Sequence, residues 1–548
     1  MSAFAITMIV VNLIMYKMAK KDPNNLFSYI SEQIEKRPND VALMYYGIPY
    51  TYCKLGIMIS NLTIRLHHFG IKSGDVVSMV LPTSPESIAL VYSLNRLGAV
   101  ACLIDVRFTI DQVTSIVSNT HSRMLFVMSH QINSIANSSP CINVEHIVSV
   151  GGYESLPKEW ASLYANRDSS NGKIEYSKDR KIMKWDTFYV DSPVKATEIY
   201  EWHKTEPQLI FQTSGTTGIS KSVVLTGENI EQSRISTLRI MNSATFNDTV
   251  LNLIPIFAFY GFLTSVHLPL SYGMKVIVIP IWKPYNFIKL ISRYKPQHIF
   301  TVPSSWDTIY NPENQSYVLN SLKTIVVAGD IVNPIYEHDI NDYLQTHGCN
   351  LNITKVYGMT ETAGIIAATP KTSKHRYDVG YSGQIVVDCQ IKIIDGEVCI
   401  CPAMKFHGYV NNPQATEQLI REHDGKMWIH TGDIGRLTES GELYIVGRKK
   451  RMIVRYDGTK IFPIEIEVAL LKCPCVRACA AVGATDPLHP QSGVPIVYVV
   501  LQDSNQSNRI AVSQYCKDHL PVYLCPERIE FVEELPVNSM GKVDYSIL

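Results

Sequence analysis

A stretch rich in glycine and hydroxyl side chains joins two apolar segments near the middle of the chain. An apolar run at 209–213 leads into Ser-Gly-Thr-Thr-Gly at 214–218, and Lys221 opens a second apolar run. Glycine lets a backbone approach an anion closely, successive N–H groups form a nest for it, and the hydroxyls add donors. The Gly-Lys pair of a Walker A loop is missing, and a strand rather than a helix is expected next. The stretch favours phosphate binding over the alternative of a flexible turn.

Three later segments carry side chains of complementary chemistry. Tyr357 offers a flat face for a base, while Thr360 and Glu361 present hard oxygens suited to Mg²⁺. Asp433, in a Thr-Gly-Asp turn, has a carboxylate that can accept both hydroxyls of a ribose. Lys542 lies in a loop bracketed by proline and glycine and can bring a positive charge to a phosphate or carboxylate. Each segment alone is explained equally well by an ordinary turn or a solvated side chain.

Taken together, in this order and at these separations, the four segments resemble those of the adenylate-forming superfamily. This superfamily includes acyl- and aryl-CoA synthetases, the adenylation domains of peptide synthetases, and luciferases. The resemblance extends from about residue 27 to the carboxyl end of the chain. It matches the phosphate loop to 213–221, the adenine and magnesium motif to 357–361, the ribose motif to 431–433, the hinge to 447–450 and the catalytic-lysine loop to 536–542.

The resemblance implies an enzyme with two half-reactions. A carboxylate attacks the α-phosphorus of ATP to give an acyl-adenylate and pyrophosphate, and a thiol then takes the acyl group. The implied catalytic residues are Lys542, Thr216 and Glu361, of which Glu361 holds Mg²⁺. Lys450 is the implied hinge, about which a small domain rotates because Lys542 lies where the thiol must enter. The implied nucleotide-binding residues are Thr213, Ser214, Gly215, Thr217, Gly218, Lys221, Gly329, Tyr357, Gly358, Thr360, Asp433 and Arg448.

One departure from the family pattern bears on the substrate. Peptide-synthetase domains carry an aspartate after the central strand to bind the substrate's amino group, and many acyl- and aryl-CoA ligases have histidine there. This chain has Ala258. Because a buried ammonium without a partner costs on the order of several kcal/mol, we expect an apolar acyl or aryl acid rather than an α-amino acid. The expected pocket residues are Phe257, Ala258 and Gly261, and the neighbouring aromatics suit a pocket wall or the core equally well.

The expected cofactors and partners are ATP, Mg²⁺, a small carboxylic acid and coenzyme A. The ending Gly-Lys-Val-Asp at 541–544 is more similar to peptide-synthetase and carrier-loading ligases, so the phosphopantetheine of an acyl carrier protein is an alternative acceptor. A non-catalytic nucleotide-binding relative and a luciferase-like oxygenase are further alternatives. Loss of activity is disfavoured because drift would remove polar residues singly, whereas all of Lys221, Glu361, Asp433, Arg448 and Lys542 are kept.

The elements that must position these residues alternate between strands and helices. Apolar runs at 76–81, 100–104, 276–279, 299–302 and 324–328 predict strands, and 87–97 predicts a helix. Such alternation favours parallel sheets covered on both faces. After Gly447 the last hundred residues have their own predicted helix at 463–472 and strands at 480–482 and 496–501.

With the resemblance, these patterns predict an α/β fold in two domains. The large N-terminal domain, at 23–447, would bind ATP and the acid in stacked αβ sheet layers with a small barrel-like subdomain. A small, mobile α+β lid domain at 448–548 would carry the catalytic lysine.

Composition sets the broad class. The 548 residues include 50 lysines and arginines against 50 aspartates and glutamates, and this balance does not favour a nucleic-acid binder. Hydrophobic residues at 46% and charged residues at 18% exclude a largely disordered chain. Twelve cysteines are too few for a disulfide scaffold. Reduced thiols fit a cytoplasmic enzyme.

The first 22 residues form an apolar leader. Residues 1–16 are uncharged and are followed by lysines at 17, 20 and 21. This run is shorter than the roughly 20 apolar residues that span a bilayer. It is interpreted as an extension upstream of a later start, a membrane anchor, or a segment packed on the domain, and membrane contact is the least favoured of the three.

Overall fold

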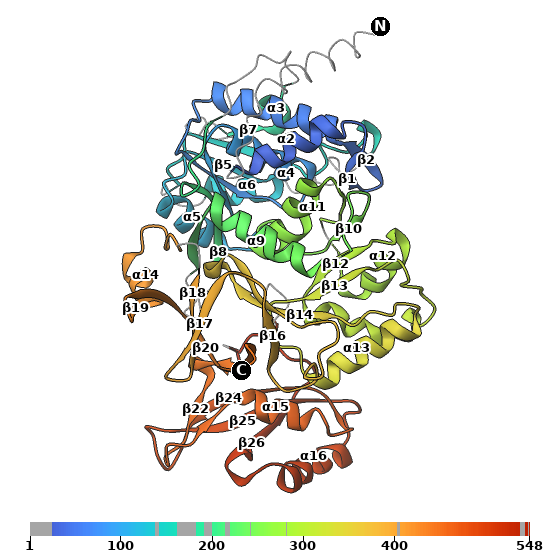
Figure 1. Ribbon diagram of the computed structural model, residues 1–548, viewed down its shortest axis with the longest axis vertical. Coiled ribbons are helices and arrows are strands. Elements are labelled where there is room, and N and C mark those ends of the chain that lie inside the picture. Colours follow the sequence, from blue (N-terminus) through green and yellow to red (C-terminus); the bar gives the residue numbers. More distant parts are fainter. Residues whose placement is uncertain are drawn as a thin grey trace.

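Two stacked sheets and their helices make up most of the molecule (Figure 1). The computed structural model describes residues 25–137, 142–161, 182–190, 200–213, 220–241, 243–280, 282–402, 406–537, 543–545 and 547–548. The predicted leader at 1–22 lies outside these ranges. No helix in the described ranges is both long and apolar enough to cross a membrane.

The first sheet has seven strands, and neighbouring strands pair in parallel except for the last two, which form an antiparallel hairpin. Their order across the sheet is β7 Ile182–Lys184, β6 His146–Val150, β5 Met124–Met128, β3 Val76–Val80, β4 Val100–Leu103, β8 Pro207–Thr213 and β9 Lys221–Thr226.

The second sheet is parallel in its middle and antiparallel at both ends. Its first part runs in the order β2 Ile48–Thr51, β1 Val41–Tyr45, β11 Lys275–Val278, β10 Thr249–Asn252, β12 His298–Thr301, β13 Thr324–Val327 and β14 Thr354–Met359. An antiparallel part continues from β14 with β15 Gly364–Ala368, β16 Tyr381–Ile385, β21 Glu442–Arg448, β20 Lys426–Leu437, β18 Glu397–Pro402 and β17 Cys389–Ile394, and β19 Ile420–His423 pairs with β20. In Figure 1 this antiparallel part curves away below the first sheet.

Helices lie between the sheets and on their outer faces. In β5, Met124 and Phe126 join a core cluster shared with the second sheet, whereas Leu125 and Val127 join a cluster on the opposite face. The central layer includes α2 Leu26–Lys36, α3 Tyr52–His68, α4 Pro85–Arg96 and α11 Leu268–Tyr272, and α4 buries all 12 of its residues. The outer layers include α5 Ile110–Asn119, α6 Ile132–Asn137, α12 Phe287–Tyr294 and α13 Pro334–Thr346. The predicted parallel sheets covered on both faces are therefore confirmed.

A smaller lobe with its own core follows η8, the turn of 3₁₀ helix at Lys449–Arg451. Its core cluster draws only on residues from Ile453 onwards. The lobe contains β22 Ile453–Val454, β23 Lys460–Ile461, α15 Pro463–Leu470, β24 Val476–Thr485, β25 Gly493–Leu501, α16 Gln506–His519 and β26 Arg528–Phe531. A mixed α/β fold of stacked sheet layers with a smaller C-terminal lobe was predicted, and it is confirmed.

Most predicted strands end within one residue of the observed ones, but β24 is much longer than the predicted 480–482. Alanine, cysteine and glycine supply half or more of this strand, which runs from Val476 to Thr485, and their low hydrophobicity hides its ends.

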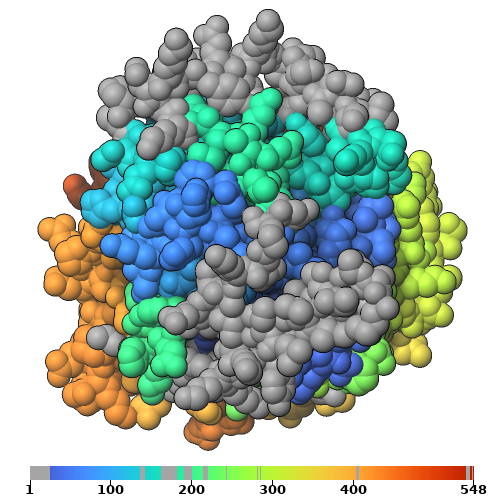
Figure 2. All heavy atoms as spheres, turned by 90° about the horizontal axis from the view of Figure 1, so that it is seen from above, coloured from blue at the N-terminus to red at the C-terminus, as the bar shows by residue number. Residues whose placement is uncertain are grey.

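Viewed from above, N-terminal segments form the middle of the face, with yellow-green segments along one side and orange ones along the other (Figure 2).

Candidate active site

The β8–β9 hairpin fixes both ends of the predicted phosphate loop. Thr213 and Lys221 face each other in the hairpin register, and the Thr213 hydroxyl donates a hydrogen bond to the Lys221 carbonyl at 3.3 Å. The Ser220 hydroxyl donates to the Thr213 carbonyl at 3.0 Å. The rest of the loop, Ser214, Gly215, Thr216, Thr217 and Gly218, lies outside the described residues. A strand follows the loop, as predicted, so the Walker A geometry is absent from this hairpin.

Tyr409 connects the phosphate-loop lysine to the predicted magnesium ligand. The Lys221 ammonium lies 4.8 Å from the centre of the Tyr409 ring, within range of a cation–π interaction. The Tyr409 hydroxyl donates a 2.8 Å hydrogen bond to Glu361 Oε1. Burial and the neighbouring carboxylate raise the pKa of Tyr409, so the phenol stays protonated and remains a donor.

Sequence reasoning did not single out Tyr409, because nothing charged marks it in the run at 406–409. Its position follows from backbone pairing: residues 408–410 run antiparallel to β9, and Tyr409 bridges Val223. A glycine before an aromatic residue was the available signal, since Gly408 has a φ of +108°.

Tyr357, Asp433 and Arg448 form a second group. The Tyr357 hydroxyl donates a 2.7 Å hydrogen bond to Asp433 Oδ2, and Arg448 Nε lies 2.9 Å from Asp433 Oδ1. Asp433 and Arg448 face each other across β20 and β21. Burial, followed by the Asp433 carboxylate, raises the pKa of Tyr357. Both carboxylate oxygens of Asp433 are therefore oriented by donors.

Asp433 was predicted to lie in a turn, but residues 431–433 are part of strand β20, where nearby side chains hold the backbone. Gly432 has a φ of +73°, a conformation that favours glycine. The Thr431 hydroxyl accepts from the Asp433 amide at 3.1 Å and donates to the Val398 carbonyl at 2.7 Å. The carboxylate therefore projects from a strand whose backbone is fixed on both sides.

Glu361 from the first group and Tyr357 from the second lie at one edge of the second sheet, whereas Lys221 belongs to the first sheet. Tyr357 and Gly358 are near the carboxyl end of β14, and η7, Thr360–Thr362, brings Glu361 directly after that strand. Gly329 follows the neighbouring parallel strand β13 with a φ of +95°. Carboxyl ends of parallel strands form the usual ligand-binding edge of an α/β sheet.

The predicted substrate-pocket residues lie at the start of α10, Phe259–Phe262. Ala258 is its N-cap residue and is partly exposed, whereas Phe257 is buried with the Arg107 guanidinium 5.3 Å from its ring centre. A side chain at Gly261 would collide with the Ile254 and Pro255 carbonyls, so close backbone packing requires glycine there.

The neighbouring aromatics Phe259 and Phe262 belong to the core, where both contact Phe211. Phe259 also lies near Gly364, whose missing side chain leaves room for it and for Ser233. The pocket segment therefore adjoins the turn that carries Glu361.

The predicted hinge and lysine loop lie at the start and end of the smaller lobe. Lys450 is exposed within η8. Lys542 lies outside the described residues, but the neck of its loop is closed by a bridge between Val537 and Val543. Next to that neck, the Tyr545 ring covers the Arg451 guanidinium at 3.4 Å.

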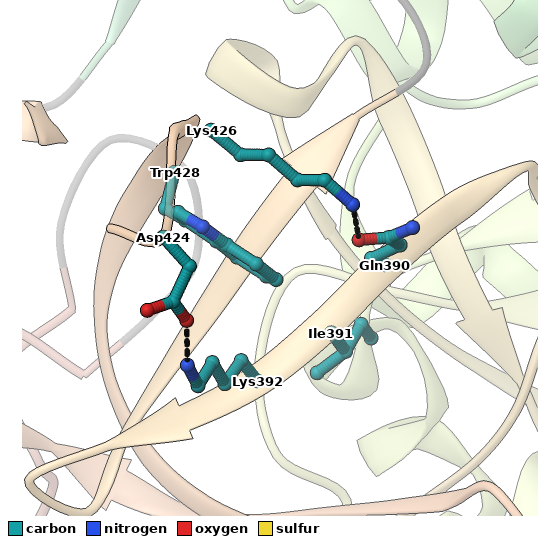
Figure 3. A pocket seen from close by; sticks show the side chains of 6 residues that line it. All are labelled: Gln390, Ile391, Lys392, Asp424, Lys426 and Trp428. Atoms are coloured by element: carbon teal, nitrogen blue, oxygen red, sulfur yellow. Dashed lines mark hydrogen bonds and ion pairs between the residues drawn. The ribbon is translucent and has the colours of Figure 1, made fainter. Parts of the chain in front are cut away.

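A surface cavity of about 540 Å³ lies apart from these residues, on the antiparallel part of the second sheet. In Figure 3 its Lys392 pairs with Asp424, and Lys426 donates to Gln390, beside Trp428. Among the predicted site residues that the structure describes, none lines this cavity.

Comparison with known proteins identifies the family. The model of the AMP-binding enzyme family matches residues 30–409, and that of the AMP-binding enzyme C-terminal domain matches residues 465–542. The chain belongs to the AMP-binding enzyme family. It is an AMP-forming acid–thiol ligase, and the predicted superfamily is confirmed.

Curated members of this family include similar proteins of nearly the same length. The 4-coumarate–CoA ligase of Vanilla planifolia is 24% identical over 95% of this chain and 92% of its own. The 4-coumarate–CoA ligase 1 of Arabidopsis thaliana is 25% identical over 95% and 92%.

Solved structures of the family share the fold. The anthranilate CoA ligase AuaEII, in complex with anthranoyl-AMP, has a TM-score of 0.79 at 20% identity, covering 95% of each chain. The amide bond synthetase McbA of Marinactinospora thermotolerans has a TM-score of 0.78 at 20% identity, covering 95% of this chain and 98% of its own.

Proposed function

We propose that this ligase activates an apolar aryl or acyl acid with ATP and transfers it to coenzyme A. One observation carries the proposal: Lys221, Tyr409 and Glu361 form one contact chain, and Tyr357, Asp433 and Arg448 form another that begins four residues from Glu361. The positive charges of Lys221 and Arg448 would then contact the same nucleotide. Glu361 would hold its magnesium ion, and Asp433 would bind its ribose.

The first half-reaction joins two anions, so its barrier falls when positive charge and donors are fixed in advance. Lys221 and the loop at 214–218 would bind the leaving phosphates, and Asp433 would accept the ribose hydroxyls. Glu361 fits a magnesium ligand, because its carboxylate is a hard oxygen donor and Tyr409 holds its Oε1 in place. Bound Mg²⁺ would neutralise charge on the phosphate oxygens. Lys542 would contact the carboxylate and α-phosphate in the transition state.

The choice of an aryl or acyl acid rests on Ala258 and on the relatives. Ala258 offers no carboxylate for an α-ammonium group. The relatives named above are 4-coumarate–CoA ligases and an anthranilate CoA ligase, which supports an aromatic ring on the acid. Coenzyme A is proposed as the acceptor on the same basis.

A panel of cinnamic, benzoic and straight-chain acids, assayed for pyrophosphate release with and without coenzyme A, tests the proposal. We expect release with at least one apolar acid, together with a coenzyme A thioester. Release without any thioester would favour a carrier protein as acceptor. No release with any acid of the panel would refute the proposed function.

A further inference from the structure

Two buried carboxylates flank the predicted hinge, one in each lobe. Glu397, on β18, is 5% exposed, and Glu467, on α15, is 7% exposed. Lys449 Nζ lies 3.1 Å from Glu397 Oε2, and an Arg451 guanidinium nitrogen lies 2.9 Å from Glu467 Oε1. Each carboxylate thus binds one of the two basic residues that adjoin Lys450.

On the large-domain side, Glu397 joins the hinge to the part of β20 that carries Asp433. Its Oε1 accepts the Gly432 amide at 2.9 Å, and its Oε2 receives both Lys449 and His430 Nδ1, the latter at 3.3 Å. Burial opposes ionisation of Glu397, but the Lys449 ammonium and the Gly432 amide outweigh it and lower its pKa. Arg448, the residue before Lys449, likewise forms an ion pair with a carboxylate of the large domain, that of Asp433.

On the small-lobe side, Arg451 is held by three groups. Besides Glu467, its guanidinium donates to the Ala481 carbonyl at 3.2 Å and is covered by the Tyr545 ring at 3.4 Å. Glu467 is itself fixed, because the Ala481 amide donates to its Oε1 at 2.9 Å. The Arg451 side chain is therefore fixed to the small lobe and would move with it.

We infer that Glu397 and Glu467 are positioning residues that confine the pivot between the lobes to Lys450. The Lys449 side chain ties the hinge to the large domain and the Arg451 side chain ties it to the small lobe, which assigns the rotation to the backbone angles of Lys450, the residue between these two attachments. A one-residue pivot gives one defined path between two orientations of the lobes, whereas a longer linker would allow many different paths. This inference rests on the proposed function, in which the lobe turns between the two half-reactions.

The chain supplies a matched test. Lys449→Met removes the ammonium from Glu397 and leaves its bonds to Gly432 and His430. Lys392→Met is the control: the Lys392 side chain is 46% exposed and that of Lys449 is 49% exposed, and Lys392 pairs with Asp424 in the turn between β19 and β20. Figure 3 shows the Lys392–Asp424 pair beside the surface cavity. Lys449→Arg, which keeps the charge, should restore the wild-type behaviour.

The first readout is hydrogen exchange of the Met452 amide in the full chain without ligands, since that amide bonds to the Lys449 carbonyl. Because a half-exposed ion pair is lost, we expect exchange about fivefold faster in Lys449→Met and unchanged in Lys392→Met and Lys449→Arg. The second readout is the ratio of thioester formation to adenylation, which should shift about threefold or more in Lys449→Met alone.

Exchange in Lys449→Met equal to that in Lys392→Met would overturn the inference, as would an unchanged ratio of the two half-reactions. A purely structural role would lower both rates equally and leave their ratio constant. Failure of the proposed function has a different signature, since wild-type protein would then release no pyrophosphate while the exchange result would still decide the hinge question.

Discussion

Tyr409 should control how well the enzyme uses Mg²⁺. Its hydroxyl holds one oxygen of Glu361, a residue only 9% exposed, at 2.8 Å. Tyr409→Phe deletes this hydrogen bond and keeps the aromatic face that Lys221 covers. Glu361 would then sample several rotamers and hold a cation less well.

The size of the effect follows from the bond that is lost. A hydrogen bond to a charged group contributes about 1.5–3 kcal/mol, and each ~1.4 kcal/mol corresponds to a factor of ten. Taking the lower end, because a bound cation would partly reorder the carboxylate, we expect kcat/KM for adenylation to fall about tenfold at limiting Mg²⁺. The loss should shrink as Mg²⁺ is raised.

Tyr29 provides a closely matched control. Its hydroxyl donates to Glu231 at 2.8 Å, and the Arg234 guanidinium lies 4.7 Å from its ring, whereas the corresponding ring distance at Tyr409 is 4.8 Å. Tyr29→Phe removes the same kind of bond without touching Glu361. Pyrophosphate release measured over a range of Mg²⁺ concentrations separates the two variants. An Mg²⁺ dependence of Tyr409→Phe identical to that of Tyr29→Phe would refute the reasoning.

Four further predictions concern the nucleotide site, the hinge, the lysine loop and pH. Asp433→Asn should raise the KM for ATP about tenfold or more, since one charged acceptor is lost; an unchanged KM in the adenylation assay would contradict this. Lys450→Pro should leave acyl-adenylate formation intact and slow thioester formation because proline fixes φ; equal loss of both steps would argue against it. Lys542→Ala should slow adenylation by about 10²–10³-fold, which stopped-flow pyrophosphate release would test. Burial, and then Glu86, raise the pKa of Glu154 to about 7, so the folded state binds a proton that the unfolded state releases above its ordinary value of 4.5. The melting temperature should therefore fall between pH 5 and pH 7, and less so in Glu154→Gln.

The local residue pattern was sufficient to place the helices and strands along the chain, but not to predict which strands pair with each other. The hairpin around the phosphate loop was readable because apolar runs bracket a short polar segment, and β3, β4 and β13 were placed to within one residue. Sheet order was not readable: β1 pairs with β11, which lies more than two hundred residues later in the chain. No local periodicity encodes such a pairing, which depends on how layers of helices pack.

At the candidate site, too, local motifs could be recognised from the sequence, whereas contacts between distant residues could not. Glu361 and Asp433 could be proposed from their own short motifs, each with a turn and a carboxylate. Tyr409 and Glu397 could not, because each acts through a partner tens of residues away. Tyr409 reaches Glu361 across 48 positions and Glu397 reaches Lys449 across 52. Neither a tyrosine in an isolated bridge nor a glutamate in a strand carries a local mark of such a contact.

The stacking of Tyr545 on Arg451 has a practical consequence for following the motion of the small lobe. If the lobe turns about Lys450, Tyr545 stays near the pivot because its ring covers Arg451, and it travels a short arc. In Figure 1, α16 lies at the far end of the lobe and would sweep a much longer one. A fluorophore on the exposed Ile510 side of α16 would therefore report rotation with the largest signal, whereas a label near Tyr545 would barely register it.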